Sequence, residues 1–265
     1  MVDEVVAWNH NNPPDVVWCC AGSSHPTLFV DTPVSVFPEQ MNSNYFTSLY
    51  MAHAVLAHWV KTPENKKKMS LRALSENNTL LDKPNSKWRW TSTKTEEPAR
   101  HLIFTASFLA FYSFTGYSPY SPAKAALRAL SDSLSQEMNL YAAACPDEPR
   151  VRLHTVFPAT ILTQSYDEEN LIKPAVTKAL EEGDAGQTAE VVAAKSIRAL
   201  EKGQELITTD ILTSLVKRSM LGGSVRGGFV AAIIDWFLAG LMGIVMVFVR
   251  YDMDQKTRKW GRLLS

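Results

Sequence analysis

Short apolar runs alternate with stretches of helical periodicity along most of the chain. The run from Val16 to Cys20 is apolar on both faces and ends at Ala21-Gly22, a pattern typical of a buried parallel strand that leads into a loop. Residues 102–106, 151–157 and 205–208 are further strand candidates of the same kind.

Helical spacing of the apolar positions connects these strands. It predicts a short helix over 2–9, a long helix over 38–60 with Pro38 in its first turn, and helices over 121–141 and 188–202. Strands that alternate with helices indicate an α/β fold built on a parallel sheet.

Residues 61–99 interrupt this alternation. They are rich in Lys, Asn, Ser and Thr and have little periodicity, which predicts a loop insertion. Trp88 and Trp90 argue against disorder throughout the segment, because paired aromatic side chains can pack against the domain.

The membrane signal lies near the C-terminus, where 229–249 carries one ionisable residue, Asp235, between Arg226 and Arg250. The stretch is long enough to span a bilayer, and a buried core helix is the alternative. A single span, a re-entrant hairpin and an interfacial helix all stay open, because Asp235 is costly at mid-depth. We expect 1–210 to form the α/β domain and 211–265 to form an interfacial and membrane-associated helical region; 211–225 suits either an interface or an ordinary amphipathic surface helix.

Composition narrows the functional classes. Of the 265 residues, 46% are apolar, which is enough for a sizeable hydrophobic core. The formal net charge is zero, so the composition does not indicate nucleic-acid binding. Cys19 and Cys20 point to opposite faces of a strand, and an odd total of three cysteines favours a reducing compartment. The N-terminus has no secretory signal pattern, and the six histidines lack ligand spacing, so we predict no metal site.

The strongest candidate chemistry is the pair Tyr120 and Lys124, which lie one helical turn apart on the same face. A tyrosine normally titrates near pH 10, and a neighbouring ammonium is expected to lower that pKa, so that the phenol serves as a general acid. Ser107 follows the predicted strand 102–106, thirteen positions before Tyr120. The serine and tyrosine hydroxyls can therefore converge on one carbonyl at the sheet edge where α/β ligand sites form.

Seen together, Cys20-Ala21-Gly22, Asn44, Ser107, Tyr120-Ser121-Pro122-Ala123-Lys124 and Pro158-Ala159-Thr160-Ile161-Leu162-Thr163 follow the order of the short-chain dehydrogenase/reductase family, which the chain resembles. The resemblance implies a Rossmann-like parallel sheet and a nicotinamide cofactor. It also implies a catalytic set of Ser107, Tyr120, Lys124 and the relay residue Asn44. Cofactor contacts are implied for Ala21, Gly22, Tyr120, Lys124, Pro158 and Thr163.

Within that family, the sequence is most similar to the fungal 3-ketodihydrosphingosine reductases, through Trp18 to Ser23, Tyr117 to Lys124 and the apolar C-terminus. This resemblance implies NADPH-dependent reduction of a long-chain keto-sphingoid lipid to sphinganine. The implied location is the endoplasmic reticulum membrane, with the catalytic domain facing the cytosol and in contact with membrane lipid. Family members commonly pair through the helices that begin near Pro38 and Ser121, so a homo-oligomer is also expected by analogy.

Departures from the family pattern leave two interpretations. The family opens with a strand and a Gly-x-x-x-Gly-x-Gly turn, and nothing before Val16 matches them, so we expect the sheet to lack its first strands and glycine-rich turn. We favour an N-terminally incomplete reductase over a non-catalytic membrane-associated fragment. A reductase of another membrane lipid ketone, such as a steroid or retinoid, is the alternative enzyme. Cys20 and Ala159 replace the usual asparagine and glycine, but both are small enough to leave room for a cofactor.

Overall fold

The computed structural model describes residues 1–60, 99–181 and 184–218, together with isolated helical positions between 236 and 251. Four parallel strands form the main sheet in the order β1-β2-β3-β6. They are β1 (Val16–Cys19), β2 (Ala99–Thr105), β3 (Arg150–Phe157) and β6 (Leu206–Thr208). All four predicted strands and their parallel pairing are therefore confirmed.

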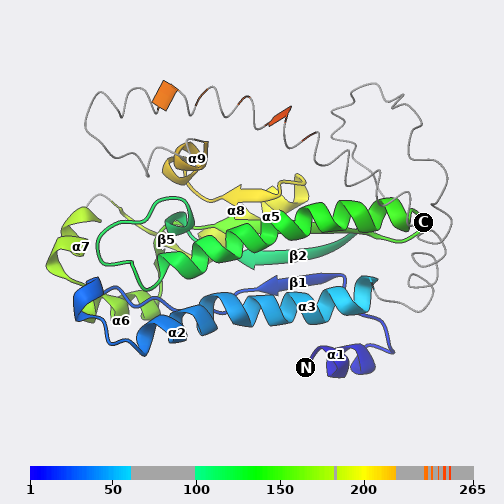
Figure 1. Ribbon diagram of the computed structural model, residues 1–265, viewed down its shortest axis with the longest axis horizontal. Coiled ribbons are helices and arrows are strands. Elements are labelled where there is room, and N and C mark those ends of the chain that lie inside the picture. The colour runs from blue at the N-terminus through cyan, green and yellow to red at the C-terminus, as the bar shows by residue number, and fades with distance from the viewer. Residues whose placement is uncertain are drawn as a thin grey trace, which may run out of the picture.

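The two faces of the sheet are covered by different helices. Leu102 and Phe104 of β2 pack on one side with α3 (Thr47–Val60) and α5 (Ser121–Ala144), which run side by side across that face in Figure 1. Ile103 points the other way and packs near Ala199 of α8 (Ala189–Glu201). Because successive strand side chains alternate, a strand that is apolar throughout buries both faces, as its sequence predicted.

The long predicted helices form with small shifts at their ends. The helix predicted over 38–60 begins two residues earlier, as α2 (Val36–Met41), and continues through a π-helical turn (Asn42–Phe46) into α3. Helix α5 runs three residues beyond the predicted end, and Pro122 occupies its first turn, where the missing N–H costs nothing. The short N-terminal helix is α1 (Val2–Trp8), and α8 matches its prediction within one residue at each end.

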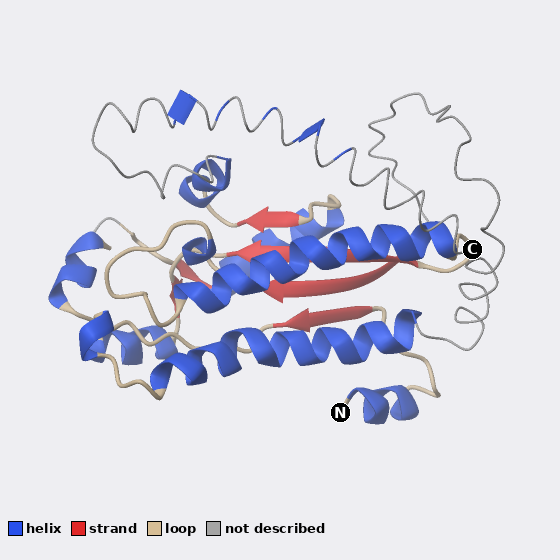
Figure 2. Cartoon of the chain, viewed as in Figure 1, coloured by secondary structure: helices blue, strands red, loops and turns tan. Residues whose placement is uncertain are grey.

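Several short elements in the connections were not predicted, because they carry no sustained periodicity. Two of them, α6 (Gln164–Ile172) and α7 (Ala175–Leu180), lie at the end of the molecule toward which the strands point (Figure 2). The others are the 3-10 turns η1 (Phe29–Asp31) and η3 (Phe108–Ala110), and the paired short strands β4 (Ile161–Leu162) and β5 (Gln187–Thr188).

The predicted insertion over 61–99 lies outside the described residues except for its last position, since Ala99 begins β2. Most of 229–249 also lies outside them. No helix among the described residues is both long enough and apolar enough to cross a bilayer. Helix α9 (Ile211–Arg218) is tied to the sheet, because Lys217 donates a hydrogen bond of 2.9 Å to the Leu206 carbonyl of β6. The proposed boundary after residue 210 stays a prediction.

A histidine pair joins β2 and β3, and His154 is its buried member. His154 lies in β3, bonded to His101 at 2.9 Å and to the Gln204 carbonyl at 2.7 Å. Burial lowers the pKa of His154 to about 4, which keeps the ring neutral at physiological pH. Among the described residues, no group of His, Cys, Asp and Glu is arranged to hold a metal ion.

Leu127 of α5 provides a test of the packing between this helix and the sheet, because its side chain is fully buried. We expect Leu127→Ala to lower the free energy of unfolding by about 2 to 5 kcal/mol, through lost transfer energy and a residual cavity. Urea unfolding followed by circular dichroism measures this change. Leu171→Ala removes the same atoms from an exposed position of α6 and should stay within about 0.5 kcal/mol of wild type. Equal losses in the two variants would contradict the packing described here.

Candidate active site

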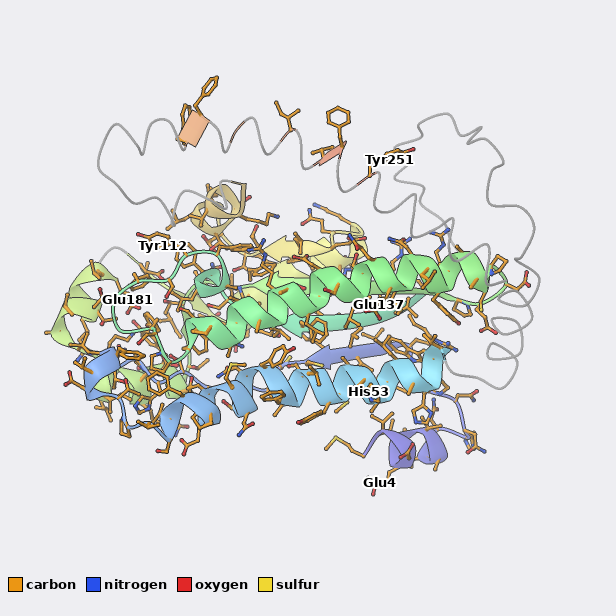
Figure 3. The ribbon with its side chains drawn as sticks, in the orientation of Figure 1. Glu4, His53, Tyr112, Glu137, Glu181 and Tyr251 are labelled. Atoms are coloured by element: carbon orange, nitrogen blue, oxygen red, sulfur yellow. The ribbon has the colours of Figure 1, made fainter. Side chains whose placement is uncertain are left out.

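The carboxyl ends of β1 and β2 bring two loops together at one edge of the sheet. The loop after Cys19 contains Ala21 and Gly22, and the loop after Thr105 contains Ser107 and leads into α5. Figure 3 labels Tyr112 of this second loop and Glu181 at the same end of the molecule. Parallel strands gather their carboxyl ends at one edge, which explains why residues far apart in sequence meet there.

Tyr120 precedes the first residue of α5, and its side chain is hydrogen-bonded to Ser107. The Ser107 hydroxyl also accepts a hydrogen bond of 3.2 Å from the Leu109 amide, which fixes the serine at the start of η3. Burial raises the pKa of Tyr120, the charge of Glu169 raises it further, and the bond with Ser107 acts in the opposite direction. The phenol therefore holds its proton at neutral pH.

Lys124 lies one turn further along α5 and is almost fully buried. Its ammonium donates a hydrogen bond of 2.9 Å to the Thr105 carbonyl at the end of β2, and it lies 5.5 Å from the centre of the Tyr120 ring. Burial lowers the pKa of Lys124 to about 8. The sequence analysis expected a lowered pKa for Tyr120, but in the protein without its cofactor burial raises it.

Asn44 is fully buried in the π-helical turn. Its amide nitrogen donates to the Ser23 carbonyl at 2.8 Å and to the Gln40 carbonyl at 3.0 Å, and its amide oxygen accepts from the Ser23 amide at 3.2 Å. These bonds join the helix to the loop after β1. A π turn frees a backbone carbonyl from the regular ladder, and such turns are frequent at functional sites.

Gly22 lies between Asn44 and Lys124. A Cβ atom at this position would approach the Asn44 Oδ1 to 2.5 Å and the Lys124 Nζ to 3.2 Å. Because Asn44 is held by several hydrogen bonds, it has little freedom to move aside. The neighbouring Ala21 is exposed, and so is Cys20, while Cys19 is buried, as the alternation of the strand predicted.

Pro158 and Thr163 lie on the neighbouring loop after β3. The Pro158 carbonyl accepts a hydrogen bond of 2.8 Å from the Phe108 amide, so this loop is tied to the segment that follows Ser107. Thr163 is exposed and caps α6, with its hydroxyl accepting from the Tyr166 amide at 3.3 Å. The predicted catalytic residues thus gather at one edge, and the cofactor roles of Pro158 and Thr163 stay predictions.

A second group of polar residues, which the sequence analysis missed, joins α6 and α7 to the tyrosine loop. The Tyr117 hydroxyl donates to the Glu181 carboxylate, and the buried Lys173 ammonium lies 2.6 Å from the other oxygen of Glu181. Thr177 of α7 donates a hydrogen bond of 3.1 Å to the Thr115 carbonyl. Helical spacing favours a pair between Glu169 and Lys173 instead, so the sequence offered no signal for this arrangement.

Gly116 allows α7 to approach the tyrosine loop closely. Its φ of +96° is in the region that favours glycine, and a Cβ atom there would clash with the Thr177 hydroxyl. The loop before Tyr120 is therefore packed directly against α7.

Characterised proteins are similar in sequence to almost the whole chain, although no protein-family model matches it. A 3-ketodihydrosphingosine reductase of Aspergillus fumigatus is 39% identical over 98% of the chain, which covers 65% of that relative. A 3-ketodihydrosphingosine reductase of Debaryomyces hansenii is 31% identical over 95% of the chain, which covers 68% of that protein. The chain belongs to the 3-ketodihydrosphingosine reductase family. It spans slightly less than two thirds of the length of the Aspergillus fumigatus relative.

Solved structures with the same fold are short-chain dehydrogenases. One from Burkholderia cenocepacia, in complex with NADP, has a TM-score of 0.54 at 15% identity, over 83% of this chain and 70% of its own. One from Sphingobium yanoikuyae, in complex with NADPH, has a TM-score of 0.51 at 12% identity, over 86% of this chain and 72% of its own. The likeness confirms the predicted Rossmann-like α/β sheet for this member of the reductase family.

The lowered pKa of Lys124 predicts how stability depends on pH. Because the folded state releases this proton at about pH 8 and an unfolded lysine releases it near 10.5, the penalty for burying the ammonium fades as pH rises. Between pH 8 and pH 9.5, the free energy of unfolding of the cofactor-free wild type should rise by about 1 to 2 kcal/mol relative to Lys124→Met. Urea unfolding at both pH values measures the difference. Parallel curves for the two proteins would show that Lys124 titrates normally.

Proposed function

We propose that the protein reduces 3-ketodihydrosphingosine to dihydrosphingosine with NADPH, as a step of sphingolipid biosynthesis. The observation that carries the proposal is the grouping of Ser107, Tyr120 and Lys124 at one edge of the sheet, in a chain of the 3-ketodihydrosphingosine reductase family. Similar proteins from several fungi are 3-ketodihydrosphingosine reductases.

Tyr120 is suited to donate the proton that a reduced ketone needs. Its partly buried phenol stays protonated at neutral pH, and the hydrogen bond from Ser107 favours the phenolate that is left after transfer. Ser107 also lies where it can hold the carbonyl oxygen in line with the phenol. Negative charge develops on the carbonyl oxygen as the ketone is reduced. Hydrogen bonds donated to this oxygen are therefore stronger in the transition state than in the ground state.

Lys124 and Asn44 would support proton transfer from Tyr120. With a pKa of about 8, Lys124 is mostly an ammonium at pH 7 and is positioned to stabilise the phenolate as it forms. Asn44 holds the loop after β1 and lies on the far side of Gly22 from Lys124, a suitable place for a water relay that returns a proton to the site.

The residues of this edge fit the nicotinamide half of NADPH. The exposed Ala21-Gly22 backbone lies beside Lys124, and any side chain at position 22 would fill the space there. Ala21, Gly22, Tyr120, Lys124, Pro158 and Thr163 would hold the cofactor. When bound, NADPH supplies the hydride for the ketone carbon.

We propose that the protein is located at the endoplasmic reticulum membrane, with its catalytic domain facing the cytosol. The reason is that the long alkyl chain of the substrate keeps the substrate in lipid. The described positions of the C-terminal region support contact with membrane lipid, because Trp236, Phe237, Ile244 and Phe248 are apolar and more than half exposed. On α9, Ile211 and Leu212 are exposed as well. A homo-oligomer through α5 and the continuous helix of α2 and α3, which begins near Pro38, is part of the same proposal.

Tyr120→Phe tests the catalytic assignment, because it removes the proton donor and keeps the ring. We expect a loss of about 100-fold to 10,000-fold in the turnover of 3-ketodihydrosphingosine, the range that a single general acid contributes. NADPH oxidation, followed by absorbance in detergent micelles that hold the substrate, measures the rate. Titration of NADPH fluorescence checks that cofactor binding persists.

Tyr112→Phe is the matched control, since Tyr112 lies on the same loop, is partly exposed and has no lysine four residues later. It should retain wild-type turnover within about twofold, as expected for an exposed surface side chain. Wild-type turnover by Tyr120→Phe would overturn the assignment. NADPH-dependent reduction of a steroid or retinoid ketone, without reduction of the keto-sphingoid lipid, would overturn the proposed substrate.

A further inference from the structure

Tyr117 has no role in the chemistry described above, yet it is bonded directly to the backbone of the proton donor. Its carbonyl accepts hydrogen bonds from the amides of Tyr120 and Ser121, at 3.1 Å and 2.9 Å. The centres of the Tyr117 and Tyr120 rings lie 6.3 Å apart, within the range of a packed aromatic pair. The position of Tyr117 therefore determines where the Tyr120 side chain begins and which surface its ring packs against.

The side chain of Tyr117 is held at its far end as well. The residue is buried, and its hydroxyl donates to a carboxylate oxygen of Glu181, which directly follows α7. Burial raises the pKa of Tyr117, and the bond to Glu181 raises it further, so the hydroxyl keeps the proton that this bond requires. A rigid ring that is fixed at both ends has little freedom to turn.

Glu181 is in turn fixed by Lys173. The Lys173 ammonium lies 2.6 Å from the second carboxylate oxygen of Glu181, and the side chain of Lys173 is only 1% exposed. The rings of Tyr166 and Tyr117 lie 4.9 Å and 5.9 Å from the same nitrogen and enclose it further. Desolvation offsets most of the attraction within a buried ion pair, so such a pair adds little net stability. Its effect here is on geometry, because it fixes the carboxylate that receives the Tyr117 hydroxyl.

The polar side of α7 faces the loop that carries Tyr117. Lys173, Thr177 and Glu181 are spaced four residues apart, which places all three on one side of this helix. Thr177 is fully buried and donates its hydrogen bond of 3.1 Å to the carbonyl of Thr115. Buried polar groups are costly unless they are bonded, and these bonds converge on the segment directly before Tyr120.

We propose that Tyr117, anchored by Glu181 and Lys173, is a positioning residue that holds the Tyr120 phenol in line with the carbonyl oxygen of the substrate. The inference rests on the proposed function and adds a positioning residue to that site. Proton transfer requires the donor within hydrogen-bond reach of the acceptor, so a small displacement of the phenol slows the chemical step more than it weakens binding. Loss of the anchor should therefore lower kcat and leave KM and NADPH affinity unchanged.

Tyr117→Phe is the first test, because it removes only the hydroxyl and leaves Lys173 paired with Glu181. We expect kcat for 3-ketodihydrosphingosine to fall about 10-fold to 100-fold, the size expected for a reacting group displaced by about 1 Å. KM and the Kd for NADPH should stay within about twofold of wild type. NADPH oxidation in detergent micelles gives the rates, NADPH fluorescence gives the affinity, and Tyr112→Phe on the same loop is the control.

The same change in the Tyr120→Phe background tests whether the effect passes through the proton donor. The double variant should keep the residual rate of Tyr120→Phe within about twofold, because the hydroxyl that Tyr117 positions is already absent. A general structural defect would lower the rate by the same factor in both backgrounds.

Two substitutions of Glu181 form a second, matched test. Glu181→Ala and Glu181→Gln both remove the charge opposite Lys173, but only glutamine keeps an oxygen that can accept the Tyr117 hydroxyl. We expect Glu181→Ala to lower kcat as Tyr117→Phe does, and Glu181→Gln to recover part of that loss.

Equal losses in the two backgrounds, or wild-type kcat in Tyr117→Phe, would overturn the inference. A change confined to KM or to NADPH affinity would also overturn it, since Tyr117 would then act in binding. Equal kcat values for the two Glu181 variants would show that the bond to the hydroxyl does not position the phenol. A wild-type protein that leaves 3-ketodihydrosphingosine unreduced would instead refute the proposed function, together with the inference that rests on it.

Discussion

The ammonium of Lys124 is buried where β1, β2 and α5 meet, and the surrounding residues are constrained by the need to accommodate it. A charge with so little contact with water requires a partner, and the Thr105 carbonyl at the end of β2 supplies one. The same position leaves no room for a side chain at residue 22. Asn44 fixes the loop on the other side of this glycine, so the helix, both strand ends and the loop are positioned by one buried group.

Burial explains why the pKa of Tyr120 is raised, whereas the sequence analysis expected it to be lowered. The spacing of Tyr120 and Lys124 correctly predicted that they share a helix face, but spacing contains no information on depth. In the folded protein Lys124 is almost fully buried and Tyr120 is partly buried, and desolvation raises the pKa of the phenol while it lowers that of the amine. Both shifts favour the neutral forms, but at pH 7 Lys124 is still mostly an ammonium, so a positive charge is already near the phenol when negative charge develops on the substrate oxygen.

Most of the sheet and its flanking helices could be predicted from sequence, because their apolar runs and helical spacing extend over many residues. The start of β2 was missed by three residues, since Arg100 and His101 are polar even though they pair with β3. The turns that hold the second polar group could not be predicted. Lys173 and Glu181 directly follow the last residues of α6 and α7, and only the fold brings them together with Tyr117.

The contact between Gly116 and Thr177 has a consequence for how such enzymes diversify. Residue 116 adopts a backbone conformation that suits glycine, and the Thr177 side chain occupies the space where a Cβ atom would lie. A change at either position alone disturbs the loop that carries the proton donor, whereas a smaller residue at 177 would relieve the clash at 116. Because the backbone at 116 favours glycine whatever side chain lies at 177, Gly116 is expected to persist during evolution, while residue 177, sixty-one positions away in the sequence, is free to become smaller.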